Sequence, residues 1–186
     1  YKWNTINIID TPWHADFGSE VERVLRMVDS VVLVVDAYEW PMPQTKFVLK
    51  KSLELWLRPI VVLNKIDKPV ARPDFVVDAL FDLFMQLGAT DDQATFPVIY
   101  ASAKQWYAMV QLPSDFATAG MTNADKEQGM EPLFEAILQY VPEAPNNPEK
   151  PFRMQIANLA YDDYLGRLGI GRVYEGTAKA GQQVTI

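Results

Sequence analysis

The stretch Pro59–Asp67 constrains the fold more than any other part of the chain, because an apolar run ends abruptly in polar side chains. Its sequence is Pro-Ile-Val-Val-Leu-Asn-Lys-Ile-Asp. A short, apolar, β-branched run predicts a fully buried strand. In an open α/β sheet, ligands bind beyond the carboxyl ends of the strands. The stretch therefore predicts a strand that presents Asn64, Lys65 and Asp67 to a small ligand.

Strand-like and helix-like segments alternate along the first 141 residues. Strands are expected at residues 6–9, 31–35, 59–64 and 96–100, and helices near 19–28, 44–55, 73–84 and 133–140. Ser19 and Glu22 have the spacing of a capping box at the start of the first helix. The third helix, entered through Arg72-Pro73-Asp74, is expected to bury Val77, Leu80, Phe81 and Phe84. This alternation predicts an α/β fold with a parallel sheet and right-handed crossovers.

The remaining segments have a different composition. Residues 105–129 are polar and rich in Gly, Ala and Thr, so a long surface loop is expected there. Residues 142–151 contain four prolines, which indicates a linker. Beyond it, residues 152–159, 165–174 and 183–186 are expected to form short strands of an all-β module. The predicted domains are therefore residues 1–141, a linker over 142–151, and residues 152–186.

Bulk composition excludes some functions. The formal charge is −7 at pH 7, with −8 in residues 1–150 and +1 in residues 151–186, which argues against broad, non-specific binding to DNA. Cysteine is absent, as is typical of a cytoplasmic protein. No apolar run reaches membrane-spanning length, so no membrane association is expected.

The polar end of the central strand has the chemistry to bind guanine. A carboxylate such as that of Asp67 accepts two hydrogen bonds from guanine, from the ring N–H and the exocyclic amine. Adenine offers neither in that geometry, and a polar site of this type discriminates by about 10⁴ or more. Lys65 can cover the base, and Asn64 can join neighbouring loops. The alternative is that residues 64–67 form an ordinary polar turn after a strand.

Two further strand ends support a nucleotide site. Ser102, Ala103 and Lys104 follow the next predicted strand, where a backbone N–H could meet the guanine carbonyl and Lys104 could cover the base. Asp10 follows the first predicted strand and is a natural outer-shell partner for Mg²⁺ on a phosphate. His14, the single histidine, is placed to orient an attacking water, although a lone histidine is usually a surface or satisfied polar residue.

These motifs together resemble the translational GTPases, and most closely the TypA/BipA group of ribosome-associated GTPases. The resemblance covers nearly the whole chain. It is based on residues 8–18, 20–23, 41–45, 64–69, 71–74 and 161–172.

The resemblance implies a P-loop NTPase-type G domain, with a mostly parallel sheet and flanking helices, followed by the start of a translation-factor β-barrel domain. It implies that GTP or GDP binds with Mg²⁺, that the ribosome (rRNA and ribosomal proteins) is the partner, and that GTP is hydrolysed by positioning and charge stabilisation. Asp10 would hold Mg²⁺ through water, and His14 would position the hydrolytic water. The implied nucleotide-binding residues are Asp10, Thr11, Pro12, Trp13, His14, Asn64, Lys65, Asp67, Ser102, Ala103 and Lys104.

The chain also departs from the family pattern. No Gly-x-x-x-x-Gly-Lys-Ser/Thr phosphate loop is present, and the first switch segment is missing as well. We therefore expect a fragment, truncated at its N-terminus, with weak or no GTP turnover when isolated.

The five tryptophans, Trp3, Trp13, Trp40, Trp56 and Trp106, are the second departure. Each stands where the family pattern would most readily place glycine, and none lies in a predicted core stripe. One hypothesis is that UGA encodes glycine in this gene and has been translated as tryptophan; deliberate substitution of five glycines is the competing idea. If the tryptophans are real, a non-hydrolytic module that binds a protein through exposed aromatic residues is the alternative function. A non-functional α/β remnant is a third possibility.

Overall fold

The computed structural model describes residues 1–11, 18–39, 43–114, 116 and 126–185. These residues belong to two compact units. The first unit contains residues 1–8 and 29–142, and the second contains residues 9–28 and 143–186. Each unit has its own sheet.

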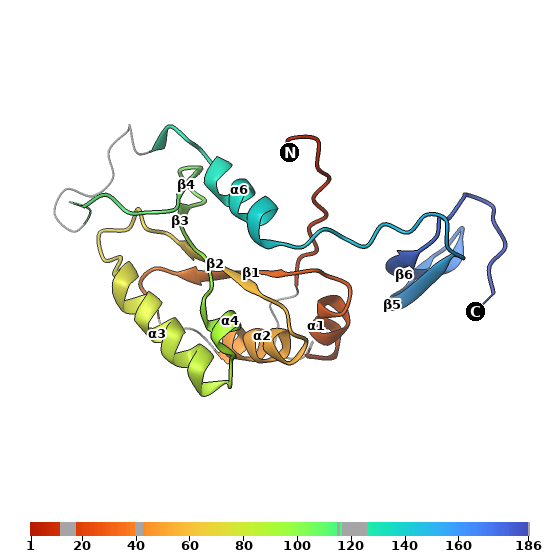
Figure 1. Cartoon of the computed structure of the whole chain (residues 1–186), viewed down its shortest axis with the longest axis horizontal. Coiled ribbons are helices and arrows are strands. Elements are labelled where there is room, and N and C mark those ends of the chain that lie inside the picture. Colours follow the sequence, from red (N-terminus) through yellow and green to blue (C-terminus); the bar gives the residue numbers. More distant parts are fainter. Residues whose placement is uncertain (12–17, 40–42, 115, 117–125, 186) are drawn as a thin grey trace. The chain divides into compact units, whose positions relative to one another are not determined.

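The first unit is built on a sheet in the order β1-β2-β3-β4 (Figure 1). The strands are β1 (Val31–Asp36), β2 (Pro59–Asn64), β3 (Val98–Ser102) and β4 (Tyr107–Met109). β1, β2 and β3 are parallel, whereas β4 is antiparallel to β3. The expected parallel α/β sheet is therefore confirmed for three strands, and their carboxyl ends lie at one edge.

Strand β2 lies inside the sheet, and every residue from Pro59 to Leu63 is buried. Its side chains alternate between two clusters: Val61 and Leu63 pack with residues of β1, α2 and α3, while Ile60 and Val62 pack with residues of β3, β4 and α6. Burial of each large aliphatic side chain stabilises the fold by about 1.5–3 kcal/mol. The continuous apolar run is therefore explained by burial on both faces.

Helices cover this sheet. They are α2 (Pro43–Glu54), α3 (Pro73–Gln86), the short α4 (Asp91–Ala94) and α6 (Glu131–Tyr140). α3 and α6 each begin at or next to a proline, whose missing N–H costs nothing there. α4 was not expected from the sequence; it begins with a capping box between Thr90 and Gln93.

The structure corrects two expectations in the first unit. Residues 105–129 are not wholly a surface loop, because Tyr107, Ala108 and Met109 form the buried strand β4. Three residues are too few to show a strand pattern, and pairing with β3 stabilises them. Phe81, which was expected to be buried, is exposed. The buried face of α3 is centred on Val76, Leu80 and Leu83. Phe81 follows Leu80 directly, so its side chain lies about 100° around the helix from that face.

The second unit contains α1 (Gly18–Leu25) and a hairpin of β5 (Arg153–Asp162) and β6 (Gly166–Glu175). α1 packs against β5, and its buried residues are Val21, Val24 and Leu25. Arg172 donates a hydrogen bond to the Met27 carbonyl at 3.1 Å, and the Tyr174 hydroxyl donates one to the Arg26 carbonyl at 3.1 Å. The hairpin thus satisfies carbonyl groups just beyond the end of α1.

Three other local expectations are wrong. Residues 6–9 form no strand, because no described strand lies beside them to complete a ladder. Residues 183–185 form no strand either, for the same reason. Ser19 is the second residue of α1 rather than its cap, and its hydroxyl oxygen accepts a hydrogen bond from Arg23 at 3.3 Å. The predicted domain boundaries stay predictions.

Candidate functional site

The candidate site lies in the first unit, where the carboxyl ends of three parallel strands meet. In register, Asp36 of β1 is opposite Asn64 of β2, and Asn64 is opposite Ala101 of β3. The loops that leave these strands therefore start side by side. An edge of this kind is where α/β proteins bind ligands.

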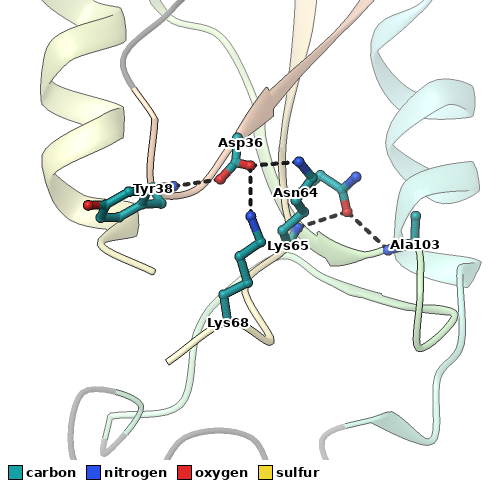
Figure 2. Close-up of polar contacts among 6 residues, drawn as sticks. All are labelled: Asp36, Tyr38, Asn64, Lys65, Lys68 and Ala103. Atoms are coloured by element: carbon teal, nitrogen blue, oxygen red, sulfur yellow. Dashed lines mark hydrogen bonds and ion pairs between the residues drawn. The ribbon is translucent and has the colours of Figure 1, made fainter. Parts of the chain in front are cut away.

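The carboxamide of Asn64 joins two of these loops (Figure 2). Its Oδ1 accepts the backbone N–H of Lys65 at 2.8 Å and that of Ala103 at 3.0 Å. The Ile66 N–H also donates to the Ala101 carbonyl, at 3.3 Å. The loops after β2 and β3 are thus held together by the protein itself.

Asp36 anchors the lysines of the loop after β2 (Figure 2). Its carboxylate lies 2.7 Å from Nζ of Lys65 and 3.3 Å from Nζ of Lys68, and accepts the Tyr38 N–H at 2.9 Å. Burial opposes ionisation of Asp36, but the Lys65, Tyr38 and Lys68 hydrogen bonds outweigh it and lower its pKa. The hydrogen bond to Asp36 raises the pKa of Lys65. Asp36 is not among the predicted site residues, although its place at the end of the adjacent strand was an available signal.

The loop after β3 is fixed by its buried serine. Ser102 is fully buried, and its Oγ accepts the Gln105 N–H at 3.2 Å. The Ala103 N–H is engaged by Asn64. Among the described residues, the Lys104 amide has no acceptor, and the Lys104 side chain is exposed. This loop therefore offers one N–H donor and one cation at the sheet edge.

Asp67 differs from Asn64 and Asp36 because its carboxylate receives no hydrogen bond from the described residues. It is half-buried, and no described residue gives it a hydrogen bond. Close by, the buried Tyr107 hydroxyl has no described partner, and burial together with the Asp67 charge raises the pKa of Tyr107 to about 12. A half-buried acceptor without a donor fits a ligand that presents N–H groups.

The predicted phosphate-site residues belong to the second unit or lie outside the described residues. Asp10 is exposed and Thr11 is half-buried, both in the second unit. The predictions for Pro12, Trp13 and His14 lie outside the described residues. No group of three or more His, Asp or Glu side chains able to hold a metal ion is found in the described part of the chain.

Comparison with known proteins identifies the class. Residues 1–143 match the family described as the elongation factor Tu GTP binding domain, and the chain belongs to that family. The predicted G-domain fold is thereby confirmed. None of the described helices is long and apolar enough to cross a membrane.

Individual relatives are similar over the whole chain. The chain is 53% identical to the large ribosomal subunit assembly factor BipA of Bacillus subtilis, 54% identical to that of Synechocystis, and 53% identical to that of Escherichia coli K12. These matches cover 100% of the chain but 29% of each relative. The predicted similarity to the TypA/BipA group is confirmed.

Proposed function

We propose that the sheet edge formed by Asn64, Lys65, Asp67 and the Ser102–Lys104 loop binds the base of a guanine nucleotide. The observation that supports this most directly is the half-buried Asp67 carboxylate, which has no donor among the described residues. It lies in a loop that Asn64 has already joined to the next loop.

Guanine has the complementary hydrogen-bonding groups. Its ring N–H and exocyclic amine would both donate to Asp67, and the Lys104 backbone N–H would donate to its carbonyl. An adenine in the same place would leave Asp67 unpaired at a site partly withdrawn from water, which is the penalty on which such selectivity depends.

The two lysines would cover the faces of the base. The Lys65 ammonium is held by Asp36, so its methylene stem is positioned while its charge is satisfied. Lys104 is exposed, so it is free to fold over a bound ligand.

We further propose that GTP is hydrolysed by the protein to which this domain belongs. Asp10, with an exposed carboxylate, would hold Mg²⁺ through water, since Mg²⁺ prefers few protein carboxylates together with phosphate oxygens. By the family resemblance, Thr11, Pro12 and Trp13 would take part in nucleotide binding, and His14 would orient the attacking water. Bound Mg²⁺ would neutralise charge that develops on the phosphate oxygens.

The names of the relatives support a proposal for the partner and the compartment. Those proteins are named as assembly factors of the large ribosomal subunit. We propose that this protein also acts on the ribosome, and therefore in the cytoplasm.

The test of the base site is substitution of Asp67 by Asn. Binding of guanosine, adenosine and xanthosine to the 186-residue chain would be compared by ligand-observed NMR. The wild-type chain should bind guanosine in preference to adenosine. The Asp67→Asn variant should lose that preference and bind xanthosine instead. The reason is that xanthine has a carbonyl in place of the exocyclic amine of guanine, and a carboxamide can donate a hydrogen bond to that carbonyl. Asp78→Asn, an exposed change of equal charge on α3, should keep guanosine preference. Equal binding of guanosine and adenosine by wild type would contradict the proposal.

A further inference from the structure

Every tryptophan that the structure describes has a left-handed backbone. The φ angles are 65° at Trp3, 60° at Trp56 and 59° at Trp106. A bulky residue is rarely found in this region, whereas glycine enters it without steric cost. Among the described residues, the other left-handed positions are Lys2, Lys65 and five glycines.

Trp56 occupies a helix-ending position that normally requires glycine. After α2, the Trp56 N–H donates to the Leu53 carbonyl at 3.0 Å and the Leu57 N–H donates to the Ser52 carbonyl at 3.0 Å. This pair of bonds is the Schellman motif, in which the left-handed C′ residue is usually glycine. Here the C′ residue is Trp56.

The end of α3 provides an internal comparison. The Gly88 N–H donates to the Met85 carbonyl at 3.1 Å, and the Ala89 N–H donates to the Phe84 carbonyl at 3.0 Å. The bonding pattern is the same as at the end of α2, and the residue in the position of Trp56 is Gly88, with a φ of 78°.

The other two tryptophans occupy comparable turns. Lys2 and Trp3 are the central residues of a turn closed by a 2.8 Å bond from the Asn4 N–H to the Tyr1 carbonyl, and both have positive φ, as in a type I′ turn. Glycine is favoured at such positions. Trp106 is the last residue of the β3–β4 turn, directly before the buried Tyr107.

The side chains do not compensate for this backbone cost by packing. Their exposed fractions are 106% for Trp3, 76% for Trp56 and 69% for Trp106. A tryptophan that contributed to a core would be buried. Binding of a partner through exposed tryptophans would not require a left-handed backbone at each of them, yet all the described tryptophans have one.

We infer that the protein made in its own cell has glycine at positions 3, 56 and 106, because its gene uses UGA as a glycine codon. A codon reassignment acts on all its occurrences together, so the inference extends to positions 13 and 40. At position 106 it places a glycine at the end of the turn that follows Ser102 and contains Ala103 and Lys104. The aromatic binding module would then have no aromatic residues at these five positions.

The decisive experiment is peptide mass spectrometry on the protein isolated from its source organism. Tryptic peptides 3–23, 27–46, 52–65 and 105–126 together contain all five positions. We expect masses that correspond to glycine at each of the five. A mass that corresponds to tryptophan at any of them would overturn the inference.

A second experiment tests the backbone requirement in recombinant protein. Trp56→Gly should raise the equilibrium constant for folding about five- to thirty-fold, since a left-handed non-glycine residue costs about that factor. Trp56→Ala, which removes the ring but keeps Cβ, should gain much less. Gly88→Ala should lose about as much as Trp56→Gly gains, because a Cβ at Gly88 meets no atom within 4 Å and only the backbone angle is penalised. Equal gains from Trp56→Ala and Trp56→Gly would contradict the inference.

Discussion

The Lys65 ammonium lies 2.7 Å from the Asp36 carboxylate, so the end of β1 fixes a lysine of the loop after β2. Lys65 itself has a φ of 68°, an unusual angle for a lysine. The ion pair and the Asn64 hydrogen bond to the Lys65 amide thus hold a conformation that the free chain would rarely adopt.

Substitution of Asp36 by Asn should release Lys65 and weaken guanosine binding. The pKa of Asp36 is lowered in the folded state, so its contribution to stability is present above the unfolded carboxyl pKa and is lost as the pH falls through the lower folded value. The wild-type advantage over Asp36→Asn should therefore exist at neutral pH and disappear in acid. Each pair should contribute less than about 1 kcal/mol, because both lysines are about half exposed.

Chemical denaturation of both proteins across this pH range would measure the effect. Asp78→Asn is the matched control, since it removes an exposed charge from α3. A stability difference that grew as the pH fell would show that Asp36 is not held ionised by its lysines.

Substitution of Asn64 by Ala should separate the two loops after β2 and β3. It removes the acceptor of two N–H groups, but Lys65 and Ala103 are exposed and water can replace that acceptor. We therefore expect a loss of about 1–2 kcal/mol in the free energy of unfolding. Asn64→Asp retains the acceptor oxygen and should lose less. Hydrogen exchange at the Ala103 amide would report the separation directly, and unchanged protection in Asn64→Ala would disprove the joining role.

Substitution of Tyr107 by Phe should stabilise the protein. The Tyr107 hydroxyl is buried with no partner among the described residues, and such a group costs about 1–3 kcal/mol. Removal of the hydroxyl should therefore raise the free energy of unfolding by about 1 kcal/mol, whereas Tyr107→Leu should lower it through lost aromatic packing. Thermal unfolding of the three proteins would test this, and a destabilised Tyr107→Phe would show that the hydroxyl has a partner.

Substitution of Gly171 by Ala should disrupt the hairpin of the second unit. A Cβ at Gly171 would clash with the Gln155 carbonyl oxygen, a backbone atom that cannot move without breaking the pairing. At Gly169, also in β6, a Cβ would meet the end of the flexible Ile156 side chain at 3.0 Å. We expect Gly171→Ala to cost about 1–3 kcal/mol and Gly169→Ala clearly less. Denaturation monitored by Tyr174 NMR signals would compare them, and equal effects would argue against the β5–β6 register.

The centre of the first unit could be predicted from the sequence because strand β2 is buried on both faces. The continuous apolar run of Pro59–Leu63 is needed because alternate side chains pack into two different core clusters. A strand with one face in water would instead alternate apolar and polar residues. β4 could not be predicted, because three residues gain stability only from their partner strand. The prediction of a strand at residues 6–9 is wrong, because an apolar sequence forms a strand only beside a partner strand and no described strand pairs with these residues.

The candidate site was predictable only in part. Asn64, Lys65 and the Ser102–Lys104 loop could be assigned from their positions after strands, since parallel strands end at one edge. The pairing of Asp36 with Lys65 and Lys68 depends on side-chain distances across two loops, which residue spacing does not contain. The left-handed angles at the tryptophans likewise appear only in three dimensions.

The two hydrogen bonds of Asn64 also have a kinetic consequence. They assemble the proposed base site before any ligand arrives, so association would need no prior loop closure and little loss of conformational entropy. Guanosine and adenosine should then associate at similar rates. The two nucleosides should differ in their dissociation rates. Adenosine should dissociate much faster, because it donates no hydrogen bond to Asp67.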